Sequence, residues 1–208
     1  MRFELLTEGK TEKKAVREFL HRAVNARLTG HVGVSMTRFE GNGEYLRKAA
    51  RKAQMFLSAR DADEIVAVIG LLDLYGLPEQ WQLGTTSDER RREVKSKIEE
   101  EVGHPRFRQF FAVHETEAWA LSDPGVFPAG VRSRLQALSR NPEGVNLSKP
   151  PARRLNDAYL QELNRGYRKV VDGQGLFSRL DPQSVVEKCP CFAAMIEEMV
   201  RLAESAGA

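Results

Sequence analysis

Several carboxylates in this sequence follow apolar runs, and they are the residues best suited to chemistry. Glu8 and Glu12 come after the first run, Asp73 ends another, and Glu115 and Glu117 follow a later one. Carboxylate oxygens are the ligands that Mg²⁺ and Mn²⁺ prefer in proteins. A cluster of them holding one or two such ions would polarise a phosphodiester and generate the hydroxide that attacks it.

The elements that must position these carboxylates are predicted strands. The apolar runs predict strands at 2–8, 31–39, 64–72 and 106–113, and amphipathic segments at 12–29, 44–59 and 88–102 predict helices between them. The run at 64–72 is apolar throughout, which is typical of a strand buried on both faces. This alternation predicts an α/β fold with a Rossmann-type, mainly parallel four-stranded sheet and helices on both faces. In such sheets, ligands bind at the carboxyl ends of the strands.

The second half of the chain lacks strand patterns. Helices are predicted at 119–121, 126–138, 151–163 and 190–203, with loops at 141–151 and at Asp172-Gly173-Gln174-Gly175. We therefore expect an α/β core over residues 1–123 and a helical extension over 124–208 that packs on it.

Composition indicates a soluble globular protein. The chain has 208 residues, of which 41% are hydrophobic and 29% charged. It contains no apolar run of membrane-spanning length and no signal-peptide pattern, so we expect a cytoplasmic protein without a membrane partner. Cys189 and Cys191 are too close together for a typical structural disulfide and are expected to be reduced thiols.

The distribution of basic residues suggests a partner, although the net charge is only +3. Basic residues of the second half, together with one in the first turn, are candidate contacts for nucleic-acid phosphates: Lys10, Arg153, Arg154, Arg168 and Lys169. For any single residue of the second half, a solvated helix face is an equally good interpretation. The cluster at 90–97 is interleaved with acidic residues, which favours an exposed helix face there.

Three segments together carry a family resemblance: EGKTE after the first strand, LLDLYGLP after the third, and HETEAWALSDP after the fourth. With the later stretches PPARRL, GYRKV and EKCPCF, the chain resembles an uncharacterised bacterial domain-of-unknown-function family with a Toprim-like core. The resemblance covers nearly the whole chain. It implies a Toprim-type fold, shared with topoisomerases, primases and overcoming-lysogenization-defect nucleases, and a role in defence against phage or other mobile DNA.

The resemblance also implies roles for individual residues. Glu8 matches the first Toprim glutamate, a general acid/base and metal contact, and Glu12 matches the second glutamate of nuclease-type members. Asp73 matches the first aspartate of the Asp-x-Asp motif, whereas Tyr75 occupies the place of the second.

The loss of the second aspartate removes one expected metal ligand. Glu115 or Glu117 would supply it from the neighbouring strand end, and His114 would contact the scissile phosphate or donate a proton.

The leading hypothesis is therefore a Mg²⁺- or Mn²⁺-dependent phosphodiesterase, or nuclease, acting on nucleic acid. The principal alternative is a catalytically degenerate Toprim module that binds nucleic acid or a partner ATPase, which Tyr75 favours. A third hypothesis is phosphoryl chemistry on a small nucleotide. A nucleotide-binding P-loop is disfavoured, because the Gly-Lys-Thr at residues 9–11 lacks the upstream glycine.

Overall fold

The computed structural model describes residues 1–9, 13–82, 84–113, 115–144 and 149–208. Within them, four strands form one sheet in the order β2-β1-β3-β4, and every pair is parallel. The strands are β1 (Arg2–Glu8), β2 (Gly33–Phe39), β3 (Ile65–Asp73) and β4 (Phe107–Ala112). The fold is therefore α/β and Rossmann-like, as the alternation of strand and helix patterns predicts.

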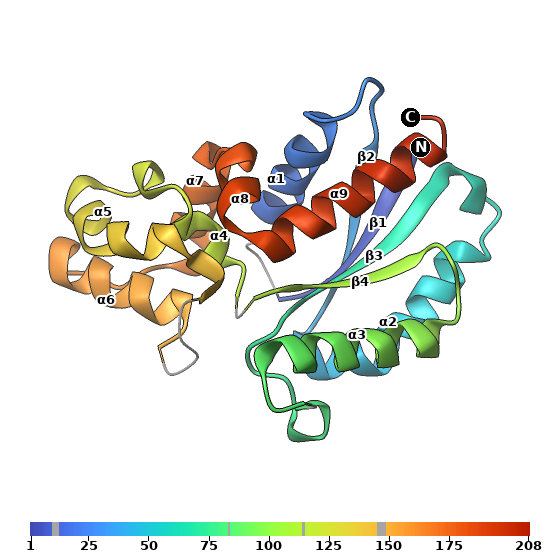
Figure 1. The fold of residues 1–208 in the computed structure, drawn as a ribbon, viewed down its shortest axis with the longest axis horizontal. Coiled ribbons are helices and arrows are strands. Elements are labelled where there is room, and N and C mark those ends of the chain that lie inside the picture. The colour runs from blue at the N-terminus through green and yellow to red at the C-terminus, as the bar shows by residue number, and fades with distance from the viewer. Residues whose placement is uncertain (10–12, 83, 114, 145–148) are drawn as a thin grey trace.

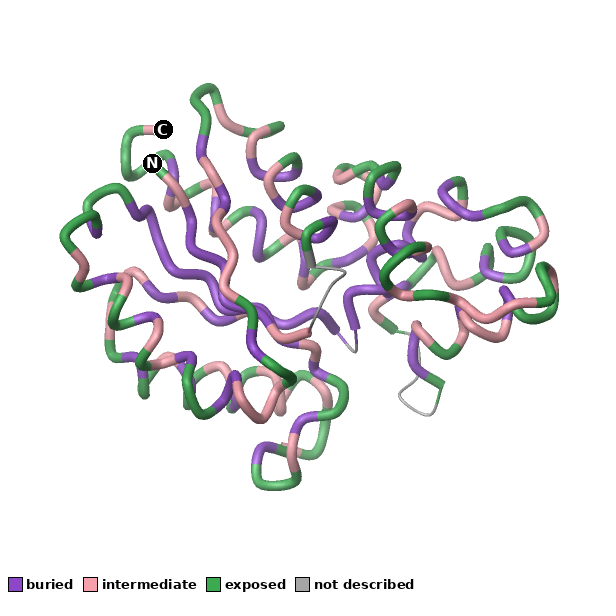
Figure 2. Tube along the Cα trace, turned by 180° about the vertical axis from the view of Figure 1, so that it is seen from behind, coloured by how far each residue is buried: buried purple, intermediate pink, exposed green. Residues whose placement is uncertain are grey.

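Two layers of helices enclose the sheet (Figure 1). One face is covered by α1 (Lys13–Asn25) and α9 (Pro190–Ser205), and the other by α2 (Gly41–Leu57) and α3 (Ser87–Val102). Strand β3 is buried from Ile65 to Leu72 because it lies inside the sheet with helices on both sides. Buried residues run along the strands and also occur in the helices on either side of the sheet (Figure 2).

The remaining helices gather beyond the carboxyl ends of the strands (Figure 1). They are α4 (Glu117–Leu121), α5 (Ala129–Leu135), α6 (Pro151–Leu163), α7 (Lys169–Arg179) and α8 (Pro182–Lys188). Short 3-10 helices complete the fold: η1 (Ala62–Glu64), η2 (Glu79–Trp81), η3 (Pro124–Val126), η4 (Gln136–Arg140) and η5 (Pro142–Gly144). No helix in the part of the chain that the structure describes is both long and apolar enough to cross a bilayer.

The predicted loop at residues 172–175 is wrong, because these residues lie inside α7. Gly173 is buried in that helix, and a Cβ placed there would lie 3.0 Å from the Tyr167 hydroxyl. Asp172 belongs to the first helical turn, where the Arg168 backbone N–H donates to its carboxylate. Close packing and capping thus outweigh the low helix propensity of glycine. Helices α7 and α8 were both missed by the sequence pattern.

An aromatic cluster joins the helices of both halves of the chain. Phe19 of α1 stacks on Phe192 of α9 with ring centroids 5.5 Å apart, and Trp119 of α4 lies 4.9 Å from Phe192. Phe177 of α7 completes the cluster, 5.7 Å from Phe19. One hydrophobic core therefore contains residues from both sides of position 123.

Candidate functional site

The fold brings acidic residues from three neighbouring strands to one edge of the sheet. Glu8 is the last residue of β1 and Asp73 the last of β3, and these two strands are paired in parallel. Asp73 lies opposite Ala112, the last residue of β4, so that Glu115 and Glu117 follow at the same edge. This is the edge at which open α/β sheets bind ligands.

Glu8 and Asp73 nevertheless face different layers. Side chains alternate along a strand, and Glu8 comes two residues after Leu6, which packs in the core beside α2 and α3. Asp73 comes two residues after Leu71, which packs in the core on the opposite face. The electrostatics agree: the charge of Glu8 acts on Tyr45 of α2, whereas that of Asp73 acts on Glu115.

Glu115, between β4 and α4, has a buried carboxyl group that contacts the first turn of α6. Its Oε2 accepts a hydrogen bond of 2.8 Å from the Ala152 backbone N–H in the first turn of that helix. Burial raises the pKa of Glu115, and the negative charges of Glu117 and Asp73 raise it further, against the opposing effects of the Ala152 hydrogen bond and the Lys169 charge. The carboxyl group is thus suited to holding a proton near the acidic cluster.

Among the described acidic residues of this edge, Glu117 has the least exposed carboxylate, with its side chain 3% exposed. Its Oε1 lies 3.0 Å from the Lys169 Nζ, which is also 3.8 Å from Glu115 Oε1. Its Oε2 is buried and has no hydrogen-bond partner among the described residues. An unsatisfied buried carboxylate oxygen is costly, and a bound cation would satisfy it.

Three predicted site residues cannot be compared with the acidic edge. Lys10, Glu12 and His114 lie outside the described residues. Within the described ranges, no three His, Cys, Asp or Glu side chains are grouped so that they could hold a metal ion by themselves. Tyr75, in the turn beyond β3, is 44% exposed.

The predicted phosphate contacts are also spread over several surroundings. Lys169 is paired with the two buried carboxylates described above. Arg168 lies with its Nε 3.6 Å from Asp172. Arg153 is exposed, and Arg154 lines a pocket between α6 and the preceding helices.

Sequence analysis missed a buried hydrogen-bonded pair of side chains that lies near Glu8. The Tyr45 hydroxyl donates a 2.6 Å hydrogen bond to Gln109 Oε1 of β4, and Tyr45 is fully buried. Gln109 interrupts the apolar run of β4, and this polar residue in a strand pattern was the available signal.

Sequence analysis also missed Glu143, which belongs to η5. It accepts backbone hydrogen bonds from Cys191 and Phe192 at the start of α9. Glu143 and Cys191 line a pocket of about 550 Å³ that Val113, directly after β4, also lines. No local pattern marks Glu143, because its partners come from a distant helix.

Comparison with protein families identifies the family of this chain. Residues 7–200 match the family described as Domain of unknown function (DUF4276). The match spans most of the chain, which therefore belongs to this family. Neither the curated proteins nor the solved structures compared with the chain gave a match.

Proposed function

We propose that this member of the DUF4276 family is a Mg²⁺- or Mn²⁺-dependent phosphodiesterase of the Toprim class that acts on nucleic acid, with a role in defence against phage or other mobile DNA. One observation carries the proposal. Acidic side chains follow the ends of three neighbouring parallel strands, and one of them, Glu117, has a buried oxygen that lacks a hydrogen-bond partner among the described residues. A cation would complete the surroundings of that oxygen.

The oxygen donors present have the chemistry that a hard divalent cation prefers, although no three of the described side chains are grouped to hold one by themselves. Asp73 and Glu117 would hold it, with Glu115 beside them, whereas Glu8 faces the other layer at the same edge and Glu12 and His114 are assigned by the sequence pattern alone. When bound, such an ion supplies Lewis-acid activation of a phosphodiester.

The chain's own groups would then handle protons and charge. Glu115, whose pKa is raised by burial, would hold or release a proton near the reacting phosphate. Lys169 lies between Glu115 and Glu117 and offsets their negative charge, which would otherwise repel a phosphate. Glu8, on the other side of the sheet edge, would serve as the general acid/base assigned to the first Toprim glutamate.

The test combines metal binding with cleavage. Titration calorimetry with Mn²⁺ and Mg²⁺ is followed by cleavage assays on labelled single- and double-stranded DNA and RNA, for the wild type and for Glu8→Gln, Asp73→Asn and Glu117→Gln. We expect Asp73→Asn and Glu117→Gln to weaken metal binding by about 10- to 100-fold. All three variants should lose cleavage.

Asp63→Asn is the matched control, because Asp63 is exposed and lies just before β3, at the opposite edge of the sheet from Asp73. It should behave like the wild type in both assays. Metal-dependent cleavage that persists undiminished in Glu8→Gln and Asp73→Asn would refute the assignment.

A second function is favoured by Tyr75. A tyrosine at the second acidic position of the Toprim motif supports a module that binds nucleic acid or a partner ATPase without cleaving. For such a module, nucleic-acid binding would be sensitive to salt yet unchanged by a chelator, and no cleavage would accompany it.

A further inference from the structure

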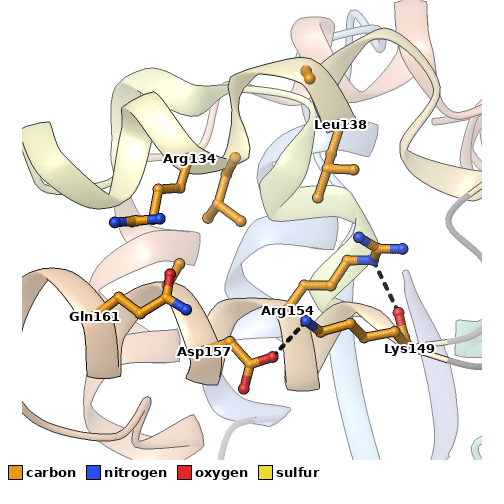
Figure 3. A pocket seen from close by; sticks show the side chains of 9 residues that line it. Arg134, Leu138, Lys149, Arg154, Asp157 and Gln161 are labelled. Carbon is orange, nitrogen blue, oxygen red and sulfur yellow. Dashed lines mark hydrogen bonds and ion pairs between the residues drawn. The ribbon is translucent and has the colours of Figure 1, made fainter.

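A basic pocket lies between α6 and the segment formed by α5 and η4 (Figure 3). Its volume is about 290 Å³. Its polar lining comprises Arg134, Lys149, Arg154, Asp157 and Gln161, so that positive side chains outnumber negative ones. Leu135 and Leu138 contribute to its apolar lining.

The three basic side chains differ in how far their charge is already balanced. Lys149 Nζ is 2.7 Å from Asp157, and Arg134 is ion-paired with Glu162. Arg154 donates from its Nε to the Lys149 carbonyl oxygen at 3.0 Å and pairs with no carboxylate in the part of the chain that the structure describes. The Nε contact orients the guanidinium, and its two terminal nitrogens have no hydrogen-bond partner among the described residues, so they can bind a ligand.

The pocket is next to the acidic edge of the sheet. Helix α6 starts at Pro151, and the Ala152 backbone N–H donates to Glu115. Arg154 follows two residues later, which is less than one helical turn. The pocket and the acidic edge are thus both in contact with the first turns of α6, close enough in the chain for neighbouring phosphates of one strand to be assigned to them.

We propose that this pocket binds a backbone phosphate of a nucleic-acid strand, next to the phosphodiester presented to the acidic edge; the proposal rests on the proposed function for the role of that neighbouring phosphodiester. The Arg154 guanidinium would bind the phosphate through paired N–H donors, and Lys149 would add a point charge. Asp157 limits the affinity because it competes for Lys149. Binding of this kind reads no base sequence.

The test is fluorescence anisotropy with labelled single-stranded DNA and RNA of about a dozen nucleotides, in chelator, over a range of salt concentrations. Arg154→Gln should weaken binding about three- to tenfold and reduce the slope of log K against log salt by about 0.7, the share of one phosphate contact on a single strand. Asp157→Asn should strengthen binding, because it frees Lys149.

Arg27→Gln is the matched control. Arg27 is exposed and follows α1, at the edge of the sheet away from the carboxyl ends, so it removes the same charge far from the pocket. It should bind as the wild type does. Equal weakening by Arg27→Gln and Arg154→Gln would reduce the effect to net charge and overturn the proposal, as would unchanged binding by Arg154→Gln. Circular dichroism melts verify that each variant is folded.

Because binding is measured in chelator, the two proposals fail separately. Arg154-dependent binding without any metal-dependent cleavage would refute the phosphodiesterase and leave the phosphate pocket. Metal-dependent cleavage, together with nucleic-acid binding that is unchanged in Arg154→Gln, would refute the pocket proposal alone. If the wild type binds neither single-stranded DNA nor single-stranded RNA, the pocket proposal is overturned.

Discussion

Lys169 balances the buried carboxylate of Glu117, and the two side chains are unequal in exposure at 41% and 3%. Removing the Lys169 ammonium group leaves the negative charge of Glu117 unbalanced in the protein interior. In fully buried ion pairs, such a loss lowers the free energy of unfolding by roughly 3–5 kcal/mol. Because Lys169 is partly solvated, we expect Lys169→Met to lower the free energy of unfolding by about 2 kcal/mol. Urea denaturation at neutral pH measures it.

The control for this prediction is Lys48→Met, which breaks the exposed pair with Glu44 and should change stability little. The double variant Lys169→Met/Glu117→Gln should regain stability relative to Lys169→Met, since it removes the uncompensated charge. If the double variant is no more stable than the single one, Glu117 is not the group that Lys169 stabilises.

Glu115 should make stability depend on pH in the direction opposite to most carboxylates. Its pKa is raised above 4.5 in the folded protein, first by burial, so that the folded state binds a proton more tightly than the unfolded chain. The free energy of unfolding contributed by Glu115 is therefore greatest below pH 4.5 and falls as the pH rises to the raised pKa. Denaturation of wild type and Glu115→Gln across this range gives the difference.

Glu198 supplies the opposite sign. Hydrogen bonds from Arg201 and Arg108 lower its pKa to about 2. Its contribution is present above pH 4.5 and is lost as the pH falls towards 2. The wild-type-minus-variant difference should therefore slope downwards with pH for Glu115→Gln and upwards for Glu198→Gln, within their separate windows. Slopes of the same sign would contradict the environment assigned to Glu115.

At the scale of elements, Gly70 of β3 leaves the space in which a side chain of α2 meets a side chain of β4 on one face of the sheet. A Cβ at Gly70 would overlap both the Tyr45 hydroxyl and the Gln109 side-chain oxygen, which are hydrogen-bonded to each other. Gly70→Ala would displace a buried polar pair in a closely packed layer. We expect it to lower the free energy of unfolding by about 3 kcal/mol, measured by chemical denaturation.

Gly33→Ala is the comparison within the same sheet. A Cβ at Gly33, in the edge strand β2, would meet the Arg2 Cβ at 3.4 Å, an ordinary contact. Its stability should stay close to that of the wild type. Similar losses for the two variants would indicate a general cost of alanine in these strands rather than the Tyr45–Gln109 contact.

Elements with strong local patterns were predictable from sequence. The uninterrupted apolar run of β3 and the proline that begins α6 gave these elements within one residue of their bounds. Helix α7 was not predictable in this way, because one of its glycines, Gly173, packs closely against Tyr167 from outside the helix. Local propensity cannot report such a contact.

Only the strand-end positions of the candidate site were predictable from the sequence. Strand-end positions placed Glu8 and Asp73 at one edge, since the carboxyl ends of parallel strands coincide. That they face opposite layers depends on the phase of each strand against its helices. The partnership of Lys169 with Glu117 depends on where α7 packs, which no spacing along the chain encodes.

At the scale of the molecule, hydrophobic cores on the two faces of one sheet should unfold together. Trp119 lies in the core shared with the second half of the chain, and Trp81 in the core beside α2 and α3. We expect Trp81→Phe and Trp119→Phe, each leaving one fluorophore, to show fluorescence midpoints that coincide with their own circular dichroism midpoints in urea. A fluorescence midpoint displaced from the circular dichroism midpoint in either variant would reveal two independently folding parts.

The stacking of Phe19 on Phe192 also has a consequence for the order in which the protein is made. The sheet can be complete once β4 has left the ribosome, but one of its faces is not covered until α9 has been synthesised, well after the four strands. Until then, apolar side chains of α1, β1 and β3 are open to solvent and to neighbouring nascent chains. We therefore expect a chaperone that binds exposed apolar segments to engage this chain after β4 has emerged and to release it when α9 emerges.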